Sequence, residues 1–343
     1  MCRSLISCVA ALLLLATAGT HAQLPPPVAP PPSPPPPFEI WLAVLRAEAM
    51  AKGIRTEVID AALEGVEEPL PQILDRDRTQ AEFTLDLETY FKQHLSRATV
   101  KTAQRMLSAN RALLKRVAAR HGVRPQVIVS VWGLESNFGR FSGVRPTIPA
   151  LVTLAYDPRR SDMFRQELFA ALEIVNRGDI ELAKLKGSWA GALGQPQFMP
   201  SKYLEYAQDF DGDGRRDIWA SLPDVFASIA YYLHEHGWAS TGQWGREVTI
   251  PKRLNEAALA IPRRATGCRA ERQMTDPRSL KEWRRFGLRT VRGAPLPSSS
   301  IQASLVQAGS RSFLLYPNYD ALLGYNCAHS YALTVGLLAD RLK

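Results

Sequence analysis

The sequence lacks a hydrophobic run long enough to cross a bilayer. The apolar stretch Val9 to Ala18 is shorter than the roughly 20 residues that a membrane helix needs, and no later segment approaches that length. We therefore expect no transmembrane span. Arg3 precedes the stretch and Thr20-His21-Ala22 follows it, an order typical of a secretory signal that ends in a small-x-Ala site. We expect residues 1–22 to be removed on export, which leaves a soluble mature protein in the periplasm.

The chain also contains few cysteines, 4 in all. Cys2 and Cys8 fall within the expected signal, and neither stands at the end of its apolar region, where a lipid-anchoring cysteine would be. Cys268 and Cys327 remain in the mature chain. An oxidising compartment favours a disulfide between them, and a nucleophilic Cys327 with His329 nearby is the weaker alternative.

The 6 histidines are scattered, and His234 and His236 lie two apart in a helical pattern, so they face different ways. This spacing indicates no transition-metal cluster. Positive charge is in excess instead: 42 Lys and Arg against 33 Asp and Glu give +9, or +8 without Arg3 of the signal. A basic surface suits a polyanion such as nucleic acid, an anionic membrane or a cell-wall polymer. Export argues against nucleic acid as the partner.

The pattern of apolar residues predicts a mainly α fold, α+β overall. Helical spacing dominates residues 38–122, where Thr99 to His121 reads as one long amphipathic helix that ends at Gly122. Pro125 then opens a buried helix in its favoured first-turn position. In chain order we expect a signal peptide at 1–22, a proline-rich linker at 23–37, an N-terminal helical domain at 38–122, a catalytic core at 123–238, a small α+β insertion at 239–316 and a C-terminal core segment at 317–343.

Within these segments the periodicity gives more local expectations. Helical patterns cover about 161–176 and 223–236, and a final helix covers about 330–342. Inside the insertion the alternation of apolar and polar residues is typical of short strands around a helix. The strands are expected at about 247–250 and 302–306, and the helix at about 280–286.

Glu135 is the sharpest candidate for catalysis. It falls on the same helical face as Ile128, Val131 and Trp132. Burial of a carboxyl group on an apolar stripe raises its pKa, and an acid that stays protonated near neutrality can protonate a glycosidic oxygen. The alternative is a glutamate at a helix end that faces water or pairs with Arg140.

A glycine-rich segment from Gly187 to Pro200 is the second candidate. Its small residues would let the backbone approach a ligand closely, and Ser188, Gln195 and Gln197 carry neutral hydrogen-bonding groups that suit sugar hydroxyls and acetamides. A tight structural loop that crosses a helix would use the same glycines, so both interpretations remain open.

The segment that begins at Asp209 matches the opening of an EF-hand loop, which predicts a structural Ca²⁺ ion. Asp209, Asp211 and Asp213 occupy positions 1, 3 and 5, and Gly212 occupies neighbouring position 4 while Gly214 supplies position 6. Position 12 is Ala220, not the usual glutamate, so closure would need a longer loop. The expected ligands are Asp209, Asp211, Asp213, Arg215, Asp217 and Asp224 in a loop over 209–224, with ordinary Asp-Gly turns as the alternative.

A second catalytic carboxylate is missing from the motifs around Glu135 and the glycine-rich segment. Ordinary glycosidases place two carboxylates about the scissile bond. A mechanism with one carboxylate must take its nucleophile from the substrate. No organic cofactor is indicated. A hydrolytic enzyme would need a second carboxylate facing Glu135, and a non-catalytic binding protein would not need the acid at all.

Taken together, the motifs resemble the B-type lytic murein transglycosylases. The likeness covers most of residues 100–343, and five motifs occur in the family's order and spacing. They are Val131-Trp132-Gly133-Leu134-Glu135-Ser136-Asn137-Phe138-Gly139, Pro158-Arg159-Arg160, the segment from Gly187 to Pro200, the Asp209 loop, and Tyr325-Asn326 with Tyr331.

The resemblance implies a lysozyme-like helical core, one calcium ion, and cleavage of peptidoglycan glycan strands between N-acetylmuramic acid (NAM) and N-acetylglucosamine (NAG) with 1,6-anhydro ends. Glu135 aligns with the family's acid/base, and Arg159 and Arg160 align with a pair expected to meet a peptide or lactyl carboxylate. Cys327-Ala328-His329 departs from the family pattern. The glycan-contacting positions implied by the resemblance are Ser188, Gln197, Met199, Tyr232, Tyr325, Asn326 and Tyr331.

Overall fold

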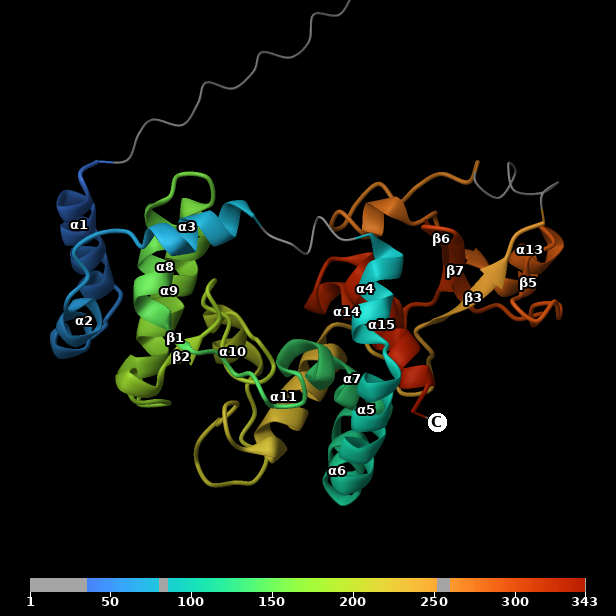
Figure 1. The fold of residues 1–343 in the computed structure, drawn as a ribbon, viewed down its shortest axis with the longest axis horizontal. Helices are drawn as coiled ribbons and strands as arrows, with labels where there is room; N and C mark the ends of the chain where they lie inside the picture. Colours follow the sequence, from blue (N-terminus) through green and yellow to red (C-terminus); the bar gives the residue numbers. More distant parts are fainter. Residues whose placement is uncertain (1–35, 80–85, 252–259, 343) are drawn as a thin grey trace, which may run out of the picture. The chain divides into compact units, whose positions relative to one another are not determined.

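The fold is mainly helical with a small antiparallel sheet, as the periodicity predicts (Figure 1). A computed structural model describes residues 36–79, 86–251 and 260–342 of the chain. The expected signal peptide, with Cys2 and Cys8, lies outside the described residues, as does most of the proline-rich linker. Among the residues described, no helix has the length and apolar character needed to span a membrane.

The first three helices pack on helices that come much later in the chain. Leu45 and Ile59 share one hydrophobic core with Leu151 and Leu168, and all four side chains are almost wholly buried. Figure 1 shows this group in blue and green. Its helices are α1 (Phe38–Ala51), α2 (Thr56–Leu63), α3 (Pro71–Arg78), α8 (Thr147–Tyr156), α9 (Ser161–Asn176) and α10 (Pro200–Tyr206).

A second core surrounds α7, whose side chains Ile128 and Val131 are fully buried. Leu114 of α6 and Leu333 of α15 pack into the same core. The expected N-terminal segment 38–122 therefore contributes to two cores instead of forming one of its own. The helices of the second core are α4 (Leu87–His94), α5 (Arg97–Ala109), α6 (Arg111–His121), α7 (Pro125–Ser136), α11 (Leu222–Glu235), α14 (Asn318–Tyr325) and α15 (His329–Asp340).

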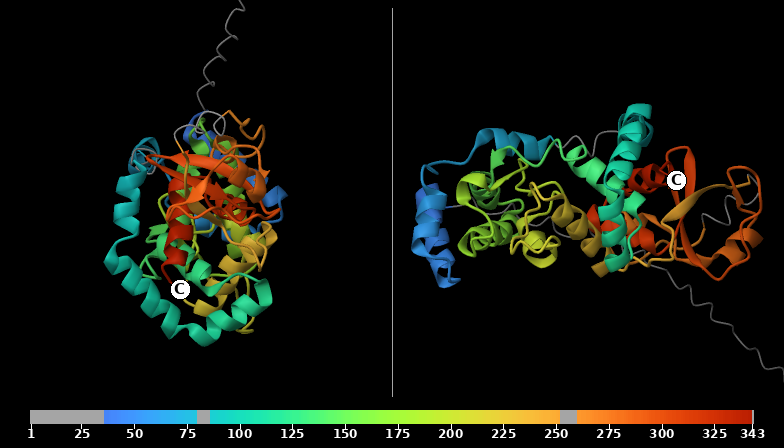
Figure 2. Two further views of the ribbon diagram at one scale, coloured as in Figure 1. Left: turned by 90° about the vertical axis from the view of Figure 1, so that its right-hand side faces the viewer. Right: turned by 90° about the horizontal axis from the view of Figure 1, so that it is seen from below.

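The prediction of one long helix from Thr99 to His121 is wrong, because the chain turns at Asn110. That residue ends α5 and precedes α6, with φ −107° and ψ 19°. Its side chain donates to the Met106 carbonyl at 3.0 Å, a local bond by which asparagine competes with the helical ladder. Figure 2 shows α4, α5 and α6 in teal, joined end to end with a change of direction between them. Both α5 and α6 consequently pack against α7.

The expected α+β insertion carries a five-stranded antiparallel sheet of order β4-β6-β7-β3-β5 and a third core around Trp283 and Leu305. The strands and the helix predicted there are confirmed. The cystine between Cys268 and Cys327, with Cα atoms 6.3 Å apart, joins the insertion to the link between α14 and α15. The elements are β3 (Gly245–Thr249), β4 (Arg278–Ser279), α13 (Leu280–Arg285), β5 (Arg289–Thr290), β6 (Gln302–Ala308) and β7 (Arg311–Leu315).

The short pieces that remain frame the glycine-rich segment. Strand β1 (Arg145–Pro146) pairs with β2 (Lys186–Gly187), so Arg145 lies opposite Gly187. The helix predicted at 223–236 is α11, and the final helix begins at His329, one residue earlier than expected. Two single 3-10 turns complete the described elements: η2 (Leu182–Lys184) and η4 (Glu271–Gln273).

Candidate active site

Six of the predicted site residues meet at one cleft of about 720 Å³. Glu135 enters it from the last turn of α7, the glycine-rich segment forms one wall, and the end of α14 closes another side. Residues that are far apart in the sequence therefore share one solvent-accessible space. The predicted residues that line it are Glu135, Ser188, Gln197, Met199, Tyr325 and Asn326.

Burial of α7 fixes the position of Glu135. Ser136 follows it and ends the helix: its Oγ donates to the Trp132 carbonyl at 2.8 Å and accepts from the Gly139 N–H at 3.0 Å. Glu135 itself is only half-buried, so its carboxylate reaches the cleft while the helix beneath it stays rigid. Glu135 therefore lies at a helix end, as the alternative expects, but its side chain lines the cleft beside Tyr331.

The chain leaves α7 through a strained turn. Asn137 and Phe138 both have left-handed backbone, with φ of 50° and 59°, a conformation that costs non-glycine residues about 1 to 2 kcal/mol each. Packing offsets the cost, since the Phe138 ring lies edge-on to Trp132 with centroids 5.8 Å apart. Gly133 makes room for that ring, because a Cβ there would approach it to 2.5 Å. Strain of this kind next to a functional group is typical of active sites.

Two tyrosines form the buried side of the carboxylate. The pKa of the Tyr331 hydroxyl lies well above its ordinary value, mainly through burial and next through the nearby charge of Glu135. The same two causes, in the same order, raise the pKa of Tyr325. Tyr325 donates to the Pro196 carbonyl at 2.8 Å, which links α14 to the glycine-rich segment. Both hydroxyls therefore stay protonated beside Glu135 over the physiological range.

The glycine-rich segment presents two polar side chains to the cleft. Ser188 and Gln197 line it, and Gln197 adopts left-handed backbone with φ 54° while its amide nitrogen donates to the Gly194 carbonyl at 2.8 Å. The glycines are needed because other parts of the protein pack closely against them. A Cβ on Gly187, for example, would lie 2.6 Å from the Ala192 oxygen. This close packing favours the interpretation of the segment as a tight structural loop over that of a backbone that approaches a ligand. Contacts to a ligand would then be made by the side chains.

Gln195 has a structural role, contrary to the expectation of sugar contact. Its side chain is buried, accepts from the Trp132 indole N–H at 2.7 Å and donates to the Trp219 carbonyl at 2.8 Å. Both ends of the amide are thus used to join α7 to the segment after the acidic loop. Loss of this residue would leave buried polar groups without partners.

Tyr232 is not among the residues that line the cleft. It is buried, donates to the Gly324 carbonyl at 2.6 Å, and stacks on His236 with ring centroids 3.9 Å apart. Its ring also lies 4.8 Å from that of Tyr325. Tyr232 therefore supports Tyr325 from behind, instead of meeting a ligand directly.

Arg159 and Arg160 are also not among the residues that line the cleft. Both pair with Asp77, whose side chain is 4% exposed, and Arg159 lies 2.8 Å from it and 2.7 Å from Asp157. The side-chain hydrogen bond from Arg159 is the main cause that lowers the pKa of Asp157. These arginines tie α3 to the turn before α9, so the assignment to a substrate carboxylate is not supported by their position.

Sequence reasoning missed two other arginines. Arg76 and Arg145 line the cleft, together with Phe141, Val144 and Trp189. Arg76 comes from α3 and Arg145 from β1, so no local motif unites them with Glu135. The one available signal was the Arg145-Pro146 pair, which follows the glutamate motif closely in sequence.

Glu135 is the only carboxylate among the described residues that line the cleft. The second acid of an ordinary glycosidase is therefore not found there, in agreement with the sequence. The alternative nucleophile is also excluded, because Cys327 is bonded to Cys268 and carries no thiol.

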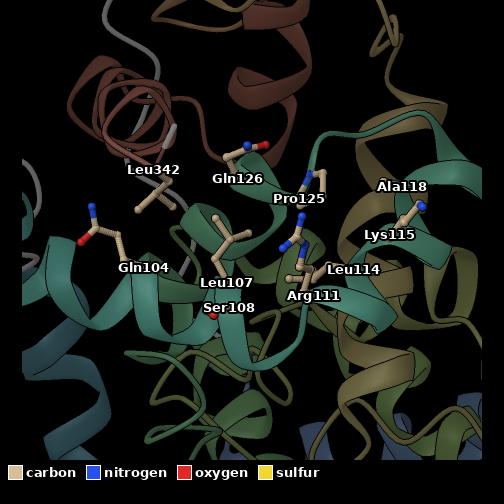
Figure 3. A pocket seen from close by; sticks show the side chains of 10 residues that line it. All are labelled: Gln104, Leu107, Ser108, Arg111, Leu114, Lys115, Ala118, Pro125, Gln126 and Leu342. Atoms are coloured by element: carbon tan, nitrogen blue, oxygen red, sulfur yellow. The ribbon is translucent and has the colours of Figure 1, made fainter.

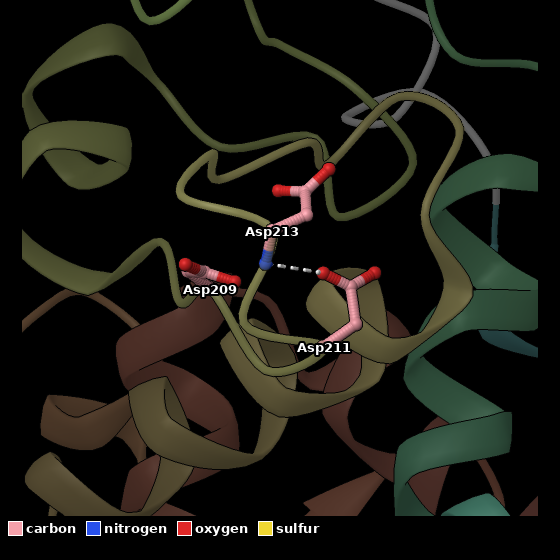
Figure 4. Close-up of side chains that lie close together, drawn as sticks. All are labelled: Asp209, Asp211 and Asp213. Carbon is pink, nitrogen blue, oxygen red and sulfur yellow. Dashed lines mark hydrogen bonds between the residues drawn. The ribbon is translucent and has the colours of Figure 1, made fainter.

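The acidic loop brings three of its six predicted ligands together. Oxygens of Asp209, Asp211 and Asp213 lie within 4.8 Å of one another, and all three side chains are exposed (Figure 4). The loop is shaped by Asp209, which accepts from the N–H groups of Gly212 at 2.7 Å and Gly214 at 2.9 Å. Three clustered carboxylates, of which Asp213 alone has a cationic partner among the described ion pairs, are chemically suited to a hard divalent cation.

Asp217 and Asp224 are not part of that cluster. Asp224 is fully buried, and its two oxygens accept from the N–H groups of Phe210 and Asp217, each at 2.8 Å. Burial raises its pKa to about 6. Asp217 in turn accepts from Trp219 and Ala220, each at 2.9 Å. Arg215 forms a 3.5 Å ion pair with Asp213.

Comparison with known proteins places the chain in a family. The profile of the Transglycosylase SLT domain matches residues 37–340. The chain belongs to the Transglycosylase SLT domain family. The match spans α1 to α15, so all three cores and the cleft lie within the SLT domain.

One curated relative is the membrane-bound lytic murein transglycosylase B of Escherichia coli (strain K12). It is 36% identical over 225 residues, which cover 64% of this SLT-domain chain and 57% of the relative. The chain thus spans little more than half of that relative's length.

Solved structures of two relatives support the fold of the SLT domain. SltB3 from Pseudomonas aeruginosa, in complex with NAG-NAM-pentapeptide, gives a TM-score of 0.81 at 39% identity over 89% of this chain and 79% of that one. The Escherichia coli lytic transglycosylase Slt35, in complex with calcium, gives 0.72 at 27% identity over 88% and 92%. These likenesses confirm the resemblance on which the lysozyme-like core was expected.

Proposed function

We propose that the protein is a peptidoglycan lytic transglycosylase that cleaves the β-1,4 bond between NAM and NAG and leaves 1,6-anhydromuramyl ends. The observation that carries this proposal is the single carboxylate, Glu135, at a cleft lined by neutral hydrogen-bonding groups. Membership of the SLT domain family and the likeness to an SltB3 structure that holds NAG-NAM-pentapeptide support it.

Glu135 serves both halves of the reaction. As an acid it protonates the glycosidic oxygen while the bond to the muramyl C1 breaks, and the substrate's own acetamide stabilises the positive charge at C1. The resulting carboxylate then removes the proton from the muramyl 6-hydroxyl, whose oxygen closes on C1. The proton count balances, because Glu135 ends the cycle protonated and no water is consumed.

Other residues bind and orient the strand. Ser188, Gln197 and Asn326 offer hydrogen bonds to hydroxyl and acetamide groups, and Met199 offers an apolar contact. We assign the lactyl or peptide carboxylate to Arg145 and Arg76, since a guanidinium binds a planar carboxylate through two parallel hydrogen bonds.

The proposal also includes a structural calcium ion in the acidic loop and export of the protein to the periplasm. Asp209, Asp211 and Asp213 would hold a Ca²⁺ ion that stabilises the loop before α11, as the complex of Slt35 with calcium suggests. The signal-like N-terminus supports export to the periplasm.

Product analysis tests the reaction type. Purified protein is incubated with isolated sacculi, and the released fragments are separated and weighed by mass spectrometry. A lytic transglycosylase releases 1,6-anhydromuropeptides. Reducing muramyl ends would identify a hydrolytic muramidase, and absence of any release would identify a non-catalytic wall-binding protein; either result contradicts the proposal.

A further inference from the structure

The whole positive excess of the protein lies in one segment. Residues 89–134 contain nine Lys and Arg and no Asp or Glu, so the remaining 33 basic and 33 acidic residues cancel. The segment runs from the third residue of α4 through α5 and α6 to the residue before Glu135 in α7. The net charge is therefore a local property of these helices and not a general feature of the surface.

Most of these cations are exposed and have no carboxylate partner. None of the exposed ones forms an ion pair within the described part of the chain. Arg116 and Arg120 lie over the Phe210 ring, at 5.3 and 5.9 Å from its centroid. The exposed cations are Lys92, Arg97, Lys101, Arg105, Arg111, Lys115, Arg116 and Arg120.

Four of them form what we call the basic face: Lys101, Arg105, Arg111 and Lys115. Lys101 and Arg105 form one pair on α5, and Arg111 and Lys115 form another on α6. The members of each pair are four residues apart, so they share one side of their helix. Like charges at this spacing destabilise a helix by a few tenths of a kcal/mol. An anionic ligand would remove that repulsion.

The α6 half of the basic face borders a groove of about 560 Å³ between α5, α6 and the start of α7 (Figure 3). Arg111 and Lys115 stand on its edge, and in Figure 3 the Arg111 side chain reaches from α6 toward Pro125. The rest of the lining is largely aliphatic. It is contributed by Leu107, Leu114, Ala118, Pro125 and Leu342.

The groove and the catalytic cleft lie at opposite ends of the same helix. Gln126 lines the groove and Glu135 lines the cleft, nine residues later on α7. At 1.5 Å per residue this is about 14 Å along the helix axis. A substrate strand that enters the cleft can therefore meet the groove with a neighbouring part of the same polymer.

A carboxylate-rich polymer fits this surface better than a lipid bilayer does. Surfaces that lie in a membrane combine cations with exposed large apolar side chains. Among the described residues, the exposed large hydrophobic side chains lie outside α4 to α7, at positions such as Ile40, Phe141 and Val291. Peptidoglycan stem peptides, by contrast, combine free carboxylates with alanine methyl groups, which match a cationic edge and an aliphatic floor.

We propose that the basic face and its groove form an accessory site that binds carboxylate-bearing stem peptides of the wall polymer outside the cleft. The inference rests on the proposed function, because it takes the wall polymer as substrate. The site would hold the enzyme on peptide-bearing strands and leave the chemistry at Glu135 unchanged.

Binding of soluble strands tests the site. The probes are uncrosslinked glycan strands of NAG and NAM, matched in length, either carrying pentapeptides or stripped of them by an amidase. Titration calorimetry compares three full-length proteins, all with Glu135→Gln so that the strands stay intact. They are the parent, a basic-face variant with Lys101, Arg105, Arg111 and Lys115 changed to Gln, and a control with the exposed Lys281, Arg284, Arg285 and Arg292 changed to Gln.

The basic-face variant should bind peptide-bearing strands at least about tenfold more weakly than the parent, and the control should not. The gap should close between 0.1 and 1 M salt, as the Debye length falls from about 10 to about 3 Å. All three proteins should bind stripped strands alike. Gln retains helix propensity, so α5 and α6 should stay folded, which circular dichroism checks.

Three results would overturn the site. Equal binding of strands by the parent and the basic-face variant would remove it, and equal losses in the variant and the control would assign the effect to net charge. In a parallel titration with phosphatidylglycerol vesicles, a loss by the variant that is confined to the vesicles would assign the face to membranes. Because binding is measured in the Glu135→Gln background, these results are independent of whether the active enzyme releases anhydro products.

Discussion

Asp77 shows at the scale of single residues why a motif match can mislead. Arg159 and Arg160 fit the family pattern, yet both guanidinium groups pair with this nearly buried carboxylate. Their pairing follows from the position of Asp77 in α3, which the motif does not contain. The position of Arg145 was equally hidden, because it depends on the pairing of β1 with β2.

A pair of variants separates the two arginine roles. Arg159→Met with Arg160→Met should lower the free energy of unfolding by about 1 to 2 kcal/mol, because Asp77 loses both partners. Its kcat/KM on sacculi should stay near that of wild type. Arg145→Met should lower kcat/KM about tenfold with little loss of stability. Urea unfolding and initial rates measure both effects, and the reverse pattern would return Arg159 and Arg160 to the substrate.

His121 makes stability depend on pH. Burial lowers its pKa from 6.5 to about 4 in the folded protein, with Arg120 and His234 adding to the effect. The unfolded chain therefore binds the proton more readily, and the stability contributed by the neutral ring is lost as pH falls below 6.5. Between pH 8 and pH 5 the loss should be about 2 kcal/mol. Urea unfolding of wild type and His121→Leu should differ in pH dependence by this amount; parallel curves would contradict it.

At the scale of elements, periodicity predicts α9, α11, α13, α15, β3 and β6, but it does not predict α8, α14 or β7, nor where helices bend. The turn at Asn110 depends on one side-chain bond and on the demand that α5 and α6 both cover α7. The strands near 247 and 302 were predictable because alternation reports a half-buried sheet. The glycine-rich segment could be located in the sequence. The different roles of buried Gln195 and cleft-lining Gln197 could not be predicted, because both are polar residues of one loop.

The acidic loop should respond to calcium. Binding to the folded state alone stabilises by about 2.7 kcal/mol at a calcium concentration of 100 times Kd, so chelation should lower Tm and added calcium should restore it. Asp211→Asn with Asp213→Asn should abolish this response, because the variant removes two of the three clustered carboxylates. Thermal unfolding followed by circular dichroism measures the shift. A wild-type Tm that ignores both chelator and calcium would count against the site.

For the whole molecule, composition predicted the basic character but not its location. The charge excess belongs to the helices that surround α7, while the cleft lies at the far end of that helix. The boundary expected at 38 follows the proline-rich composition before it, and the boundary at 122 follows the helical pattern that ends at Gly122. The packing follows hydrophobic faces instead, which send α1 to α3 to one core and α4 to α6 to another. Assignment of faces to partners requires the tertiary structure.

The central claim is that Glu135 alone donates the proton to the glycosidic oxygen and later removes the proton of the muramyl 6-hydroxyl. Glu135→Gln keeps the size and hydrogen-bonding reach of the side chain but can do neither, and general acid/base catalysis contributes a factor of roughly 10² to 10⁴. We expect this variant to fold like wild type and to release 1,6-anhydromuropeptides from sacculi at least about a thousandfold more slowly, as followed by mass spectrometry. A folded Glu135→Gln protein that keeps more than about a tenth of wild-type release would show that the catalytic acid lies elsewhere.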